Sequence, residues 1–563
     1  MVVIGSILLS SCDSYLDIQP VGQVIPTTLT EYRALLTTAY GLKLIDKSVT
    51  EFRTDIAMVT DNSNSQNFYS EIEKWNDMSP KDGTREFGWA VYYSVIYYAN
   101  AIIANKDNIK IMCQNAKETI YWLDSIGVPF NRTNENKISQ RKFGGTKKIR
   151  TCYSSDYTGL KILHTLYDRC IEQNIEFRNE HLLLNLIIEN DKCIGVTALD
   201  IKEGTVKEFL SKTTILATGG YAGIYTNHTT NSYSNTADGI AIAFDAGVEL
   251  SNMEFVQFHP TSLESSNILI SESARGEGGY LLDEEENRFI DELKPRDEVA
   301  RAIYERIEKN QKVYLDLRHL GIDKIKELMP QERRLALDYS NIRIEEQLLP
   351  VTPASHYSMG GIKTDKDART NIKNLYACGE CAEASIHGAN RLGGNSLLEI
   401  VTFGKIAGIN ASNKAKEINE INKSNTISKE INIINEIYKY PNETNFYDKK
   451  DEIGKLLYDN LGLFRNEIKT LDLIDKIKEI QSEIKSMGIK DKSKYYNKNL
   501  VEFIEFKNII NVALLVCISA LNRKESRGSH FRLDFPFELE DYEKNCIIKK
   551  LNDEIVFKFE EIR

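Results

Sequence analysis

One stretch, from Gln257 to Asp297, constrains this chain more than any other, because it sets one histidine, three arginines and several acids among glycines and prolines. A solvated helix would spread its charges at helical spacing. Here HPT, SESARGEGG and KPRD place charged groups close to a Gly or Pro that fixes the backbone. Similar clusters return at SHYSMGG (355–361) and HGANRLGGNSL (387–397). Such density is typical of a binding or catalytic site, so the sequence predicts a site assembled from several loops.

Length and composition indicate a globular chain. With 563 residues we expect about three to four domains, and 42% hydrophobic residues can fill several cores. The 71 basic and 82 acidic residues give a net charge of -11, so no global charge favours nucleic acid or an anionic membrane surface. Local basic clusters must therefore do any anion binding. No apolar run reaches the length that spans a bilayer, and the segment 509–521 is interpreted as a buried helix.

The nine cysteines form no dense framework and are interpreted as mostly reduced thiols. Cys378 and Cys381 form a CxxC, which would suit a redox or metal pair. No second pair lies nearby, so two ordinary packed or partly exposed thiols are the preferred interpretation, and no metal site is predicted.

Eight motifs carry a family resemblance: FVQFHPT, ARGEGG, PRD, VYLDLRHLG, HYSMGGI, CGE, HGANRLGGNSL and RKESRGSHFR. In this order, from about Met112 to Asp534, they resemble the flavoprotein subunit of fumarate reductases and succinate dehydrogenases, with aspartate oxidases as close relatives. The resemblance implies an α/β fold in which an incomplete, Rossmann-like FAD-binding domain (109–257 and 355–412) carries an α+β capping domain (258–354). A C-terminal helical domain (413–563) would follow.

The same resemblance implies the chemistry. FAD would be the cofactor, fumarate and succinate the substrates, and an iron-sulphur subunit and a membrane anchor subunit the partners, at the cytoplasmic face of the inner membrane. Fumarate reduction needs cations on both carboxylates and a proton donor near the alkene. Three sets of residues match the family's: for substrate binding His259, Ser271, His356 and Arg391; for catalysis the proton donor Arg296 with its relay Glu272 and Arg275; for cofactor binding Thr218, Gly219, Gly220, Asp238, Glu380, Ser396 and Leu397.

Two alternatives bear on this site. Without the surrounding motifs, Arg296 would be interpreted as an ion-pair partner of Asp297 or Glu298 at a helix start. Aspartate oxidases carry Glu where this chain has Phe143, and a carboxylate there could meet the substrate ammonium. Phe143 thus favours an unsubstituted four-carbon diacid over L-aspartate.

The N-terminus suggests a different protein. Residues 1–12 end in the Leu-Ser-Ser-Cys pattern of a bacterial lipoprotein signal, in which Cys12 would be lipidated. Residues 13–108 are similar to the opening of SusD-like nutrient-binding lipoproteins of the bacterial outer membrane, so a surface glycan-binding lipoprotein is a third hypothesis. The aromatics near Tyr93 and Tyr97 recur at helical spacing, which favours helix packing over glycan stacking. The abrupt change near residue 108 predicts a chimeric chain.

The dinucleotide motif GxGxxG is not found in the sequence: VVIGS at the start is followed by Ile7, Leu8 and Leu9 instead of further glycines. Without that loop the FAD pyrophosphate would lack its helix N-terminus. The sequence therefore predicts the substrate half of a fumarate/succinate site on a chain that binds FAD weakly or not at all.

Overall fold

The computed structural model describes residues 103–142, 149–421 and 427–562. The predicted lipoprotein signal, the SusD-like fragment up to residue 102, and Phe143 lie outside these residues. The structure therefore bears on the predicted FAD-binding, capping and helical parts.

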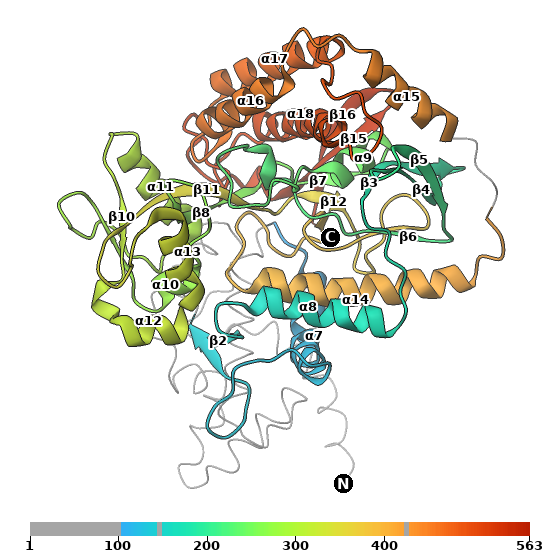
Figure 1. Ribbon diagram of the computed structural model, residues 1–563. Coiled ribbons are helices and arrows are strands. Elements are labelled where there is room, and N and C mark those ends of the chain that lie inside the picture. Colours follow the sequence, from blue (N-terminus) through green and yellow to red (C-terminus); the bar gives the residue numbers. More distant parts are fainter. Residues whose placement is uncertain (1–102, 143–148, 422–426, 563) are drawn as a thin grey trace, which may run out of the picture. The chain divides into compact units, whose positions relative to one another are not determined.

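The predicted FAD-binding part alternates strands with helices, and its two segments are shown in Figure 1. Its first segment forms α7 (Lys106–Ser125), β1 (Gln140–Lys142), β2 (Ile149–Cys152), α8 (Thr158–Glu172), β3 (His181–Glu189), β4 (Lys192–Asp200), β5 (Thr205–Leu210), β6 (Thr214–Leu216), α9 (Asp238–Asp245) and β7 (Leu250–Ser251). The second forms β12 (Gly361–Lys363), β13 (Leu375–Ala377), β14 (Ala382–Glu383) and α14 (Asn395–Lys416).

Helix α7 shows how sequence sets these elements. The Asn105 side chain accepts hydrogen bonds from the backbone N–H groups of Asp107 and Asn108, which caps the helix start. Apolar residues then recur every three to seven positions, and Ile109 and Met112 pack in one cluster with Phe403 of α14. Helix α8 contributes Ile162 to a second cluster that contains Val401 of α14. Helix α14 is therefore the element against which both earlier helices pack.

Segments far apart in sequence meet at β6 and β13, which pair in parallel with Leu375 opposite Thr214. Strand β6 ends at Leu216 and the chain turns at Gly219, whose φ is +76°. A positive φ is accessible to glycine without steric cost. The turn brings residues 218–220 beside the loop that follows β13.

The predicted capping segment has its own sheet and core. Strands β8 (Val256–Leu263), β11 (Leu349–Ser358), β10 (Tyr314–Asp316) and β9 (Tyr280–Leu282) form an antiparallel sheet in that order. Helices α10 (Glu272–Gly276), α11 (Arg296–Ile307), α12 (Ile322–Leu328) and α13 (Pro330–Ser340) accompany it. A separate apolar cluster, whose members run from Leu263 to Val351, lies within this segment. That independent core favours a domain near the predicted boundaries.

The C-terminal segment is mainly helical, with α15 (Ile427–Lys439), α16 (Phe446–Leu461), α17 (Glu467–Glu483) and α18 (Lys498–Asn522) gathered together in Figure 1. Helix α18 is long and apolar enough to span a membrane by composition, but its apolar residues are largely buried against α9, α16 and α17, as expected for 509–521.

The C-terminal end differs from the predicted helical domain. Residues 544–561 form a hairpin of β15 (Lys544–Leu551) and β16 (Glu554–Glu561), which extends the sheet β14-β12-β7-β15-β16. Asn552 and Asp553 both have positive φ, as a two-residue hairpin turn requires. The last strands thus complete a sheet begun near Leu250, a pairing that local periodicity did not indicate.

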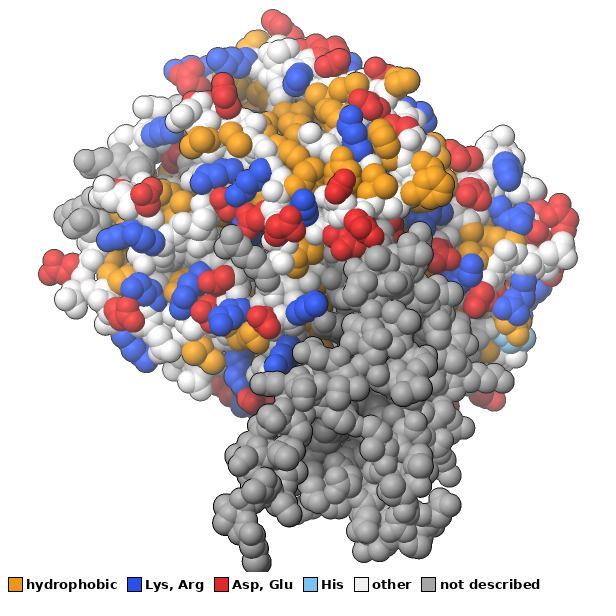
Figure 2. All heavy atoms as spheres, turned by 180° about the vertical axis from the view of Figure 1, so that it is seen from behind, with side chains coloured by type: hydrophobic (Ala, Val, Ile, Leu, Met, Phe, Trp, Pro, Cys, Tyr) orange, Lys and Arg blue, Asp and Glu red, His pale blue; other side chains and the backbone are white. Residues whose placement is uncertain are grey.

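Charged side chains of both signs are mixed over the face shown in Figure 2, beside a patch of hydrophobic side chains. Large exposed hydrophobic residues near the C-terminal end include Leu533, Phe537, Leu539, Leu551, Ile555 and Val556. The mixture on this face gives no continuous basic stripe of the kind that tracks nucleic acid.

Candidate dicarboxylate and flavin site

Two histidines from neighbouring strands face each other. His259 on β8 and His356 on β11 have ring centroids 5.0 Å apart, because the strands pair with His259 opposite Ala354. The Nδ1 atom of His259 lies 3.0 Å from the Thr261 carbonyl oxygen, and Nδ1 of His356 lies 2.7 Å from the Thr230 hydroxyl. Each ring is therefore fixed from one side.

Arg296, the first residue of α11, reaches toward the same strand. Its Nε donates to Glu272 Oε2 at 3.0 Å, and Nη1 donates to Gln257 Oε1 at 2.9 Å. The Nη2 atom of Arg296 also contacts Glu272 Oε2, so two guanidinium nitrogens share one carboxylate oxygen. The alternative pairing with Asp297 or Glu298 is not formed, since Asp297 pairs with Arg301 and Glu298 with Lys294.

Arg275 completes the predicted relay on α10. Its Nη2 lies 3.7 Å from Glu272 Oε1, and its Nη1 donates to the Glu292 carbonyl at 2.8 Å. Burial lowers the pKa of Arg275 to about 10, because Glu272 offsets the lost hydration only in part. One carboxylate thus serves two guanidiniums.

Arg391 differs from both. It is 5% exposed, yet no ion pair or side-chain hydrogen bond joins its guanidinium to another residue in the described part of the chain. Its contact is the ring of Tyr357, 4.2 Å away. Burial, and then the charge of Arg296, lowers the pKa of Arg391 to about 10. Glu380 and Glu272 offset this only in part, and a buried cation without a direct ion pair is costly.

The histidines add donors without adding charge. Burial, followed by the neighbouring His356 and Arg296, lowers the pKa of His259 well below its usual value. Burial, followed by Arg296 and Arg391, does the same for His356. Both rings are neutral near pH 7, so the positive charge facing the histidines comes from the arginines.

Ser271 is the N-cap of α10. Its hydroxyl accepts from the Ser273 backbone N–H at 3.2 Å, and the Ser273 hydroxyl contacts it at 2.9 Å. The residue therefore fixes the start of the helix that carries Glu272 and Arg275. The structure assigns this capping contact, whereas the predicted contact with substrate stays a prediction.

Several predicted cofactor residues meet at the turn after β6. Glu380 Oε1 accepts from both the N–H and the hydroxyl of Ser358 at 3.0 Å, and burial raises the pKa of Glu380 to about 7. A side chain at Gly220 would overlap Ser358 and Glu380, so backbone alone fits there. Thr218 packs against Gly239 and hydrogen bonds with Cys381.

Asp238 is engaged differently from the prediction. It lies in the first turn of α9, and its carboxylate accepts hydrogen bonds from Thr236 and from Asn508 of α18. These contacts join α9 to the C-terminal helices. A role in cofactor binding stays a prediction, because both carboxylate oxygens already have partners.

The start of α14 offers backbone donors. Gly394 precedes it with φ +83°, and no side chain caps the helix, so the first N–H groups, including those near Ser396 and Leu397, have no side-chain acceptor at the cap. The buried Asn395 Nδ2 and Arg391 Nε also have no partner, and at Gly379 nothing lies within 4 Å of the position a Cβ would take. These donors and this open space fit the ring end of FAD.

Sequence reasoning assigned no role to Gln257, which links the two halves of the site. Its Nε2 donates to Asn390 Oδ1 and to the Arg391 carbonyl, both at 2.7 Å, while its Oε1 receives Arg296. Its place two residues before His259, on the same face of β8, was the available signal. Thr230, the partner of His356, lies in a loop without any motif.

The CxxC cysteines are packed thiols. The Cys381 sulfur lies 3.3 Å from the Cys378 carbonyl, both thiols are free, and burial raises the pKa of Cys378 to about 12 and of Cys381 to about 11. Thiols with such pKa values carry little thiolate near neutral pH. Within residues 103–142, 149–421 and 427–562, no cluster of three or more His, Cys, Asp or Glu side chains could hold a metal ion.

Comparison with known proteins identifies the family. Residues 76–397 match the family described as FAD binding domain, and residues 450–562 match the fumarate reductase flavoprotein C-terminal family. The flavoprotein subunit of 8-methylmenaquinol:fumarate reductase from Wolinella succinogenes is 37% identical over 453 residues, which cover 77% of this chain and 74% of that protein. This chain belongs to the fumarate reductase/succinate dehydrogenase flavoprotein family.

Other members of this flavoprotein family are similar to the chain over most of its length. The succinate dehydrogenase flavoprotein subunit of Rickettsia bellii is 35% identical, with 81% of each chain covered. A quinol fumarate reductase structure from Escherichia coli superimposes with a TM-score of 0.80 at 31% identity, covering 84% of this chain and 87% of that one. The predicted FAD cofactor and α/β flavoprotein fold are confirmed at family level. The match begins at residue 76, inside the fragment predicted to be SusD-like, which the comparisons do not support.

Proposed function

We propose that this chain is a flavoprotein subunit that interconverts fumarate and succinate, and that Arg391, His259, His356 and Arg296 form its dicarboxylate clamp. The observation that carries the proposal is the buried Arg391 guanidinium, which makes no ion pair within 4 Å among the described residues and whose charge Arg296 further disfavours. A carboxylate bound there would supply the missing negative charge and accept bidentate hydrogen bonds.

The chain's own residues divide the work. Arg391 and His356 would bind one carboxylate, and His259 the other, with the two imidazoles acting as neutral donors. Arg296 would hold the proton that is transferred at the alkene carbon. An arginine is a poor acid in water, so this role needs a dry site and a base that restores the proton.

Glu272 is the group in place to restore that proton. It contacts Arg296 on Oε2 and Arg275 on Oε1, so a proton can pass from the Arg275 side to Arg296 across one carboxylate. Arg275 itself is fully buried, and its lowered pKa of about 10 makes it a better acid than a solvated arginine. Removal of Glu272 would therefore stop proton return more than substrate binding.

FAD, when bound, supplies the hydride chemistry of the family. Glu380, the turn at Gly219 and Gly220, and the first backbone N–H groups of α14 would hold it in this chain. The absence of GxGxxG from the sequence leaves no glycine-rich loop for the pyrophosphate. We therefore propose that FAD binding is weak, and that activity is low for this reason and not for want of substrate contacts.

The expected partners are an iron-sulphur subunit and a membrane anchor subunit at the cytoplasmic face of the inner membrane. The support is that relatives at 37% and 35% identity are named as flavoprotein subunits, of a menaquinol:fumarate reductase and of succinate dehydrogenase. Co-purification of the chain with such subunits would test this directly.

Two measurements test the function. Calorimetric titration with malonate, succinate and L-aspartate should show binding of the first two and little binding of the third, because Phe143 stands where aspartate oxidases carry a Glu that can meet the ammonium. Succinate-dependent dye reduction after addition of FAD should then report turnover. Stoichiometric FAD absorbance in the purified protein would contradict weak cofactor binding, and peroxide release with L-aspartate would favour aspartate oxidase.

A further inference from the structure

Two carboxyl groups meet at the joint between the predicted capping and FAD-binding segments. Glu332 lies in the first turn of α13 and is 3% exposed, and Asp156 lies in the turn between β2 and α8. Their side chains hydrogen bond to each other. Two carboxylates can share such a bond only when one of them carries a proton.

Asp156 also caps helix α13, whose own N-cap residue makes no side-chain hydrogen bond. Met329 precedes α13 without any side-chain hydrogen bond, and Asp156 Oδ2 accepts from the Gln331 backbone N–H at 2.6 Å instead. A carboxylate at a helix N-terminus is stabilised by the free N–H groups and the helix dipole. The cap therefore comes from the FAD-binding segment, while the helix belongs to the capping segment.

Glu332 also reaches the candidate site. Its carboxyl group accepts a hydrogen bond from the backbone N–H of Ser271, the N-cap of α10. The next residue along α10 is Glu272, which holds Arg296 and Arg275. A chain of contacts thus runs from Asp156 through Glu332 to the helix that presents the proposed proton relay.

We propose that Glu332 is a positioning residue, which shares one proton with Asp156 and thereby fixes α10 and the closed joint between the two segments. This inference rests on the proposed function for the role of α10, but the joint itself does not depend on flavin or substrate. In the protonated state the pair bridges three segments. When both groups are ionised they repel each other, and the hydrogen bond between them is lost.

The surroundings set the pH at which this happens. Burial, and then the charge of Asp156, raises the pKa of Glu332 to about 8, although Arg141 of β1 opposes the shift. Arg141 also interacts with Glu277 at the end of α10 and with Tyr153 after β2, so its charge is shared among several groups. Because the pKa in the folded protein is above the unfolded value, the contribution is complete at acid pH and is lost as pH rises to about 8.

The first test is hydrogen exchange of the apoprotein at about pH 7 and about pH 9, corrected for the intrinsic pH dependence of exchange. The peptide containing Ser271 should exchange about tenfold faster at the higher pH in the wild type. Glu332→Gln should abolish that increase, because the amide donates to Asp156 and still accepts from Ser271 at every pH. Glu327→Gln, which changes an exposed carboxylate of α12, is the matched control and should behave as the wild type.

Malonate binding supplies the second readout. Wild-type affinity should fall about fivefold between pH 7 and 9, and Glu332→Gln should keep its affinity, since His259 and His356 stay neutral throughout. Identical exchange in the wild type and Glu332→Gln would overturn the inference, whether or not malonate binds. Failure to bind malonate at any pH, with the exchange difference intact, would instead refute the proposed function. If Glu332→Gln does not fold, Asp156→Asn preserves the cap and donates to Glu332, and carries the same expectations.

Discussion

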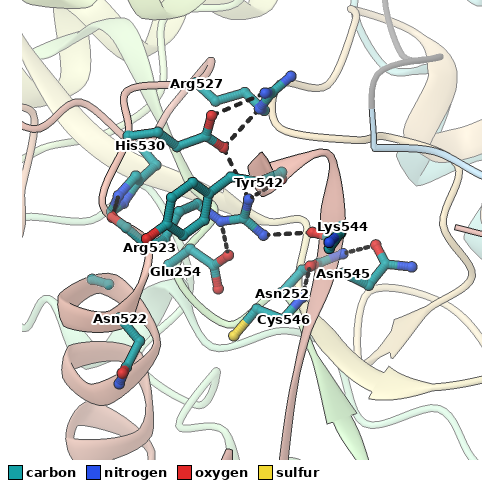
Figure 3. A network of polar contacts seen from close by, with 12 residues as sticks. Asn252, Glu254, Asn522, Arg523, Arg527, His530, Tyr542, Lys544, Asn545 and Cys546 are labelled. Carbon is teal, nitrogen blue, oxygen red and sulfur yellow. Dashed lines mark hydrogen bonds and ion pairs between the residues drawn. The ribbon is translucent and has the colours of Figure 1, made fainter. Parts of the chain in front are cut away.

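Two buried clusters of arginine, glutamate and histidine in this chain have opposite electrostatic balance. In the cluster shown in Figure 3, all three guanidinium nitrogens of Arg523 have acceptors: Nε donates to Glu254 at 2.6 Å and Nη1 to Glu525 at 2.9 Å. The remaining nitrogen, Nη2, donates to the carbonyl of Lys544 at 2.8 Å. Around Arg391 no such acceptors are present among the described residues.

The pKa values express the difference. Burial disfavours the charge on Arg523, but Glu254, Cys546 and Glu525 more than offset this, and its pKa is raised. The pKa of Arg391 is lowered to about 10, because burial is reinforced by Arg296. The same residue type, buried in both places, thus marks a structural joint in one place and the proposed ligand site in the other. What distinguishes them is whether the protein itself supplies the anion.

The largest effect should come from breaking the saturated cluster. Arg523→Met should lower the free energy of unfolding by about 3–5 kcal/mol, because Glu254 would remain buried without its ion pair and Glu525 would keep only Arg527. Urea denaturation of the apoprotein measures this. Arg306→Met, which breaks the partly exposed 3.6 Å pair with Asp283, is the control and should cost about 1 kcal/mol or less.

Removing the cation at Arg391 should have little effect on stability and a large effect on ligand binding. Arg391→Met should leave the free energy of unfolding within about 1 kcal/mol of the wild type, or raise it, because no partner is abandoned. Malonate affinity should fall by about 2–3 kcal/mol, which is roughly 30- to 150-fold, because a charge-assisted hydrogen bond is lost. Calorimetry and denaturation on the same preparation separate the two effects. A stability loss as large as that of Arg523→Met would show that the two clusters do not differ.

The sequence was sufficient to find the open site, since His259, Arg296, His356 and Arg391 each lie in a short motif rich in glycine, proline or charge. The buried helix α18 was also predictable, from the apolar run at 509–521. Residues that act through partners far along the chain were not. Glu332 meets Asp156 across 176 positions, which no local pattern encodes. The C-terminal hairpin was missed for the same reason, because its partner strand β7 lies about 300 residues earlier.

Cofactor residues were predicted least securely. Glu380 lies at the turn as expected, but Asp238 is engaged with Asn508 of α18. That partner became visible only once the C-terminal helices were packed against α9. Tertiary packing therefore decides which of two chemically equal carboxylates is left to face a ligand.

An intermediate effect is expected from pH. Burial lowers the pKa of both His259 and His530, so their unfolded forms bind protons that the folded forms exclude. Stability should fall as pH drops below about 6, by up to about 1.4 kcal/mol per pH unit for each ring. Malonate should flatten the part due to His259, because a bound anion favours the imidazolium, and should leave the part due to His530 unchanged. Thermal denaturation of the wild type and of His530→Gln, with and without malonate, would separate the rings. Both proteins retain His259, so they should respond equally to malonate, and loss of the malonate response in His530→Gln would contradict the assignment.

The smallest effect concerns the thiols beside the flavin end of the site. If the polar groups near Arg391 lacked partners as its guanidinium does, Cys378 and Cys381 would be reactive. Burial raises both pKa values, and the Cys381 sulfur is engaged by the Leu216 and Cys378 carbonyls at 3.4 and 3.3 Å. Iodoacetamide at about pH 8 should therefore label Cys170 on the partly exposed face of α8 before either of them. Cys381→Ser should change malonate affinity less than about twofold, because the group contacts backbone and not the clamp. Rapid labelling of the pair in the folded protein would instead mean that this side of the site opens to solvent, and that the unpaired charge on Arg391 is relieved by water before any dicarboxylate arrives.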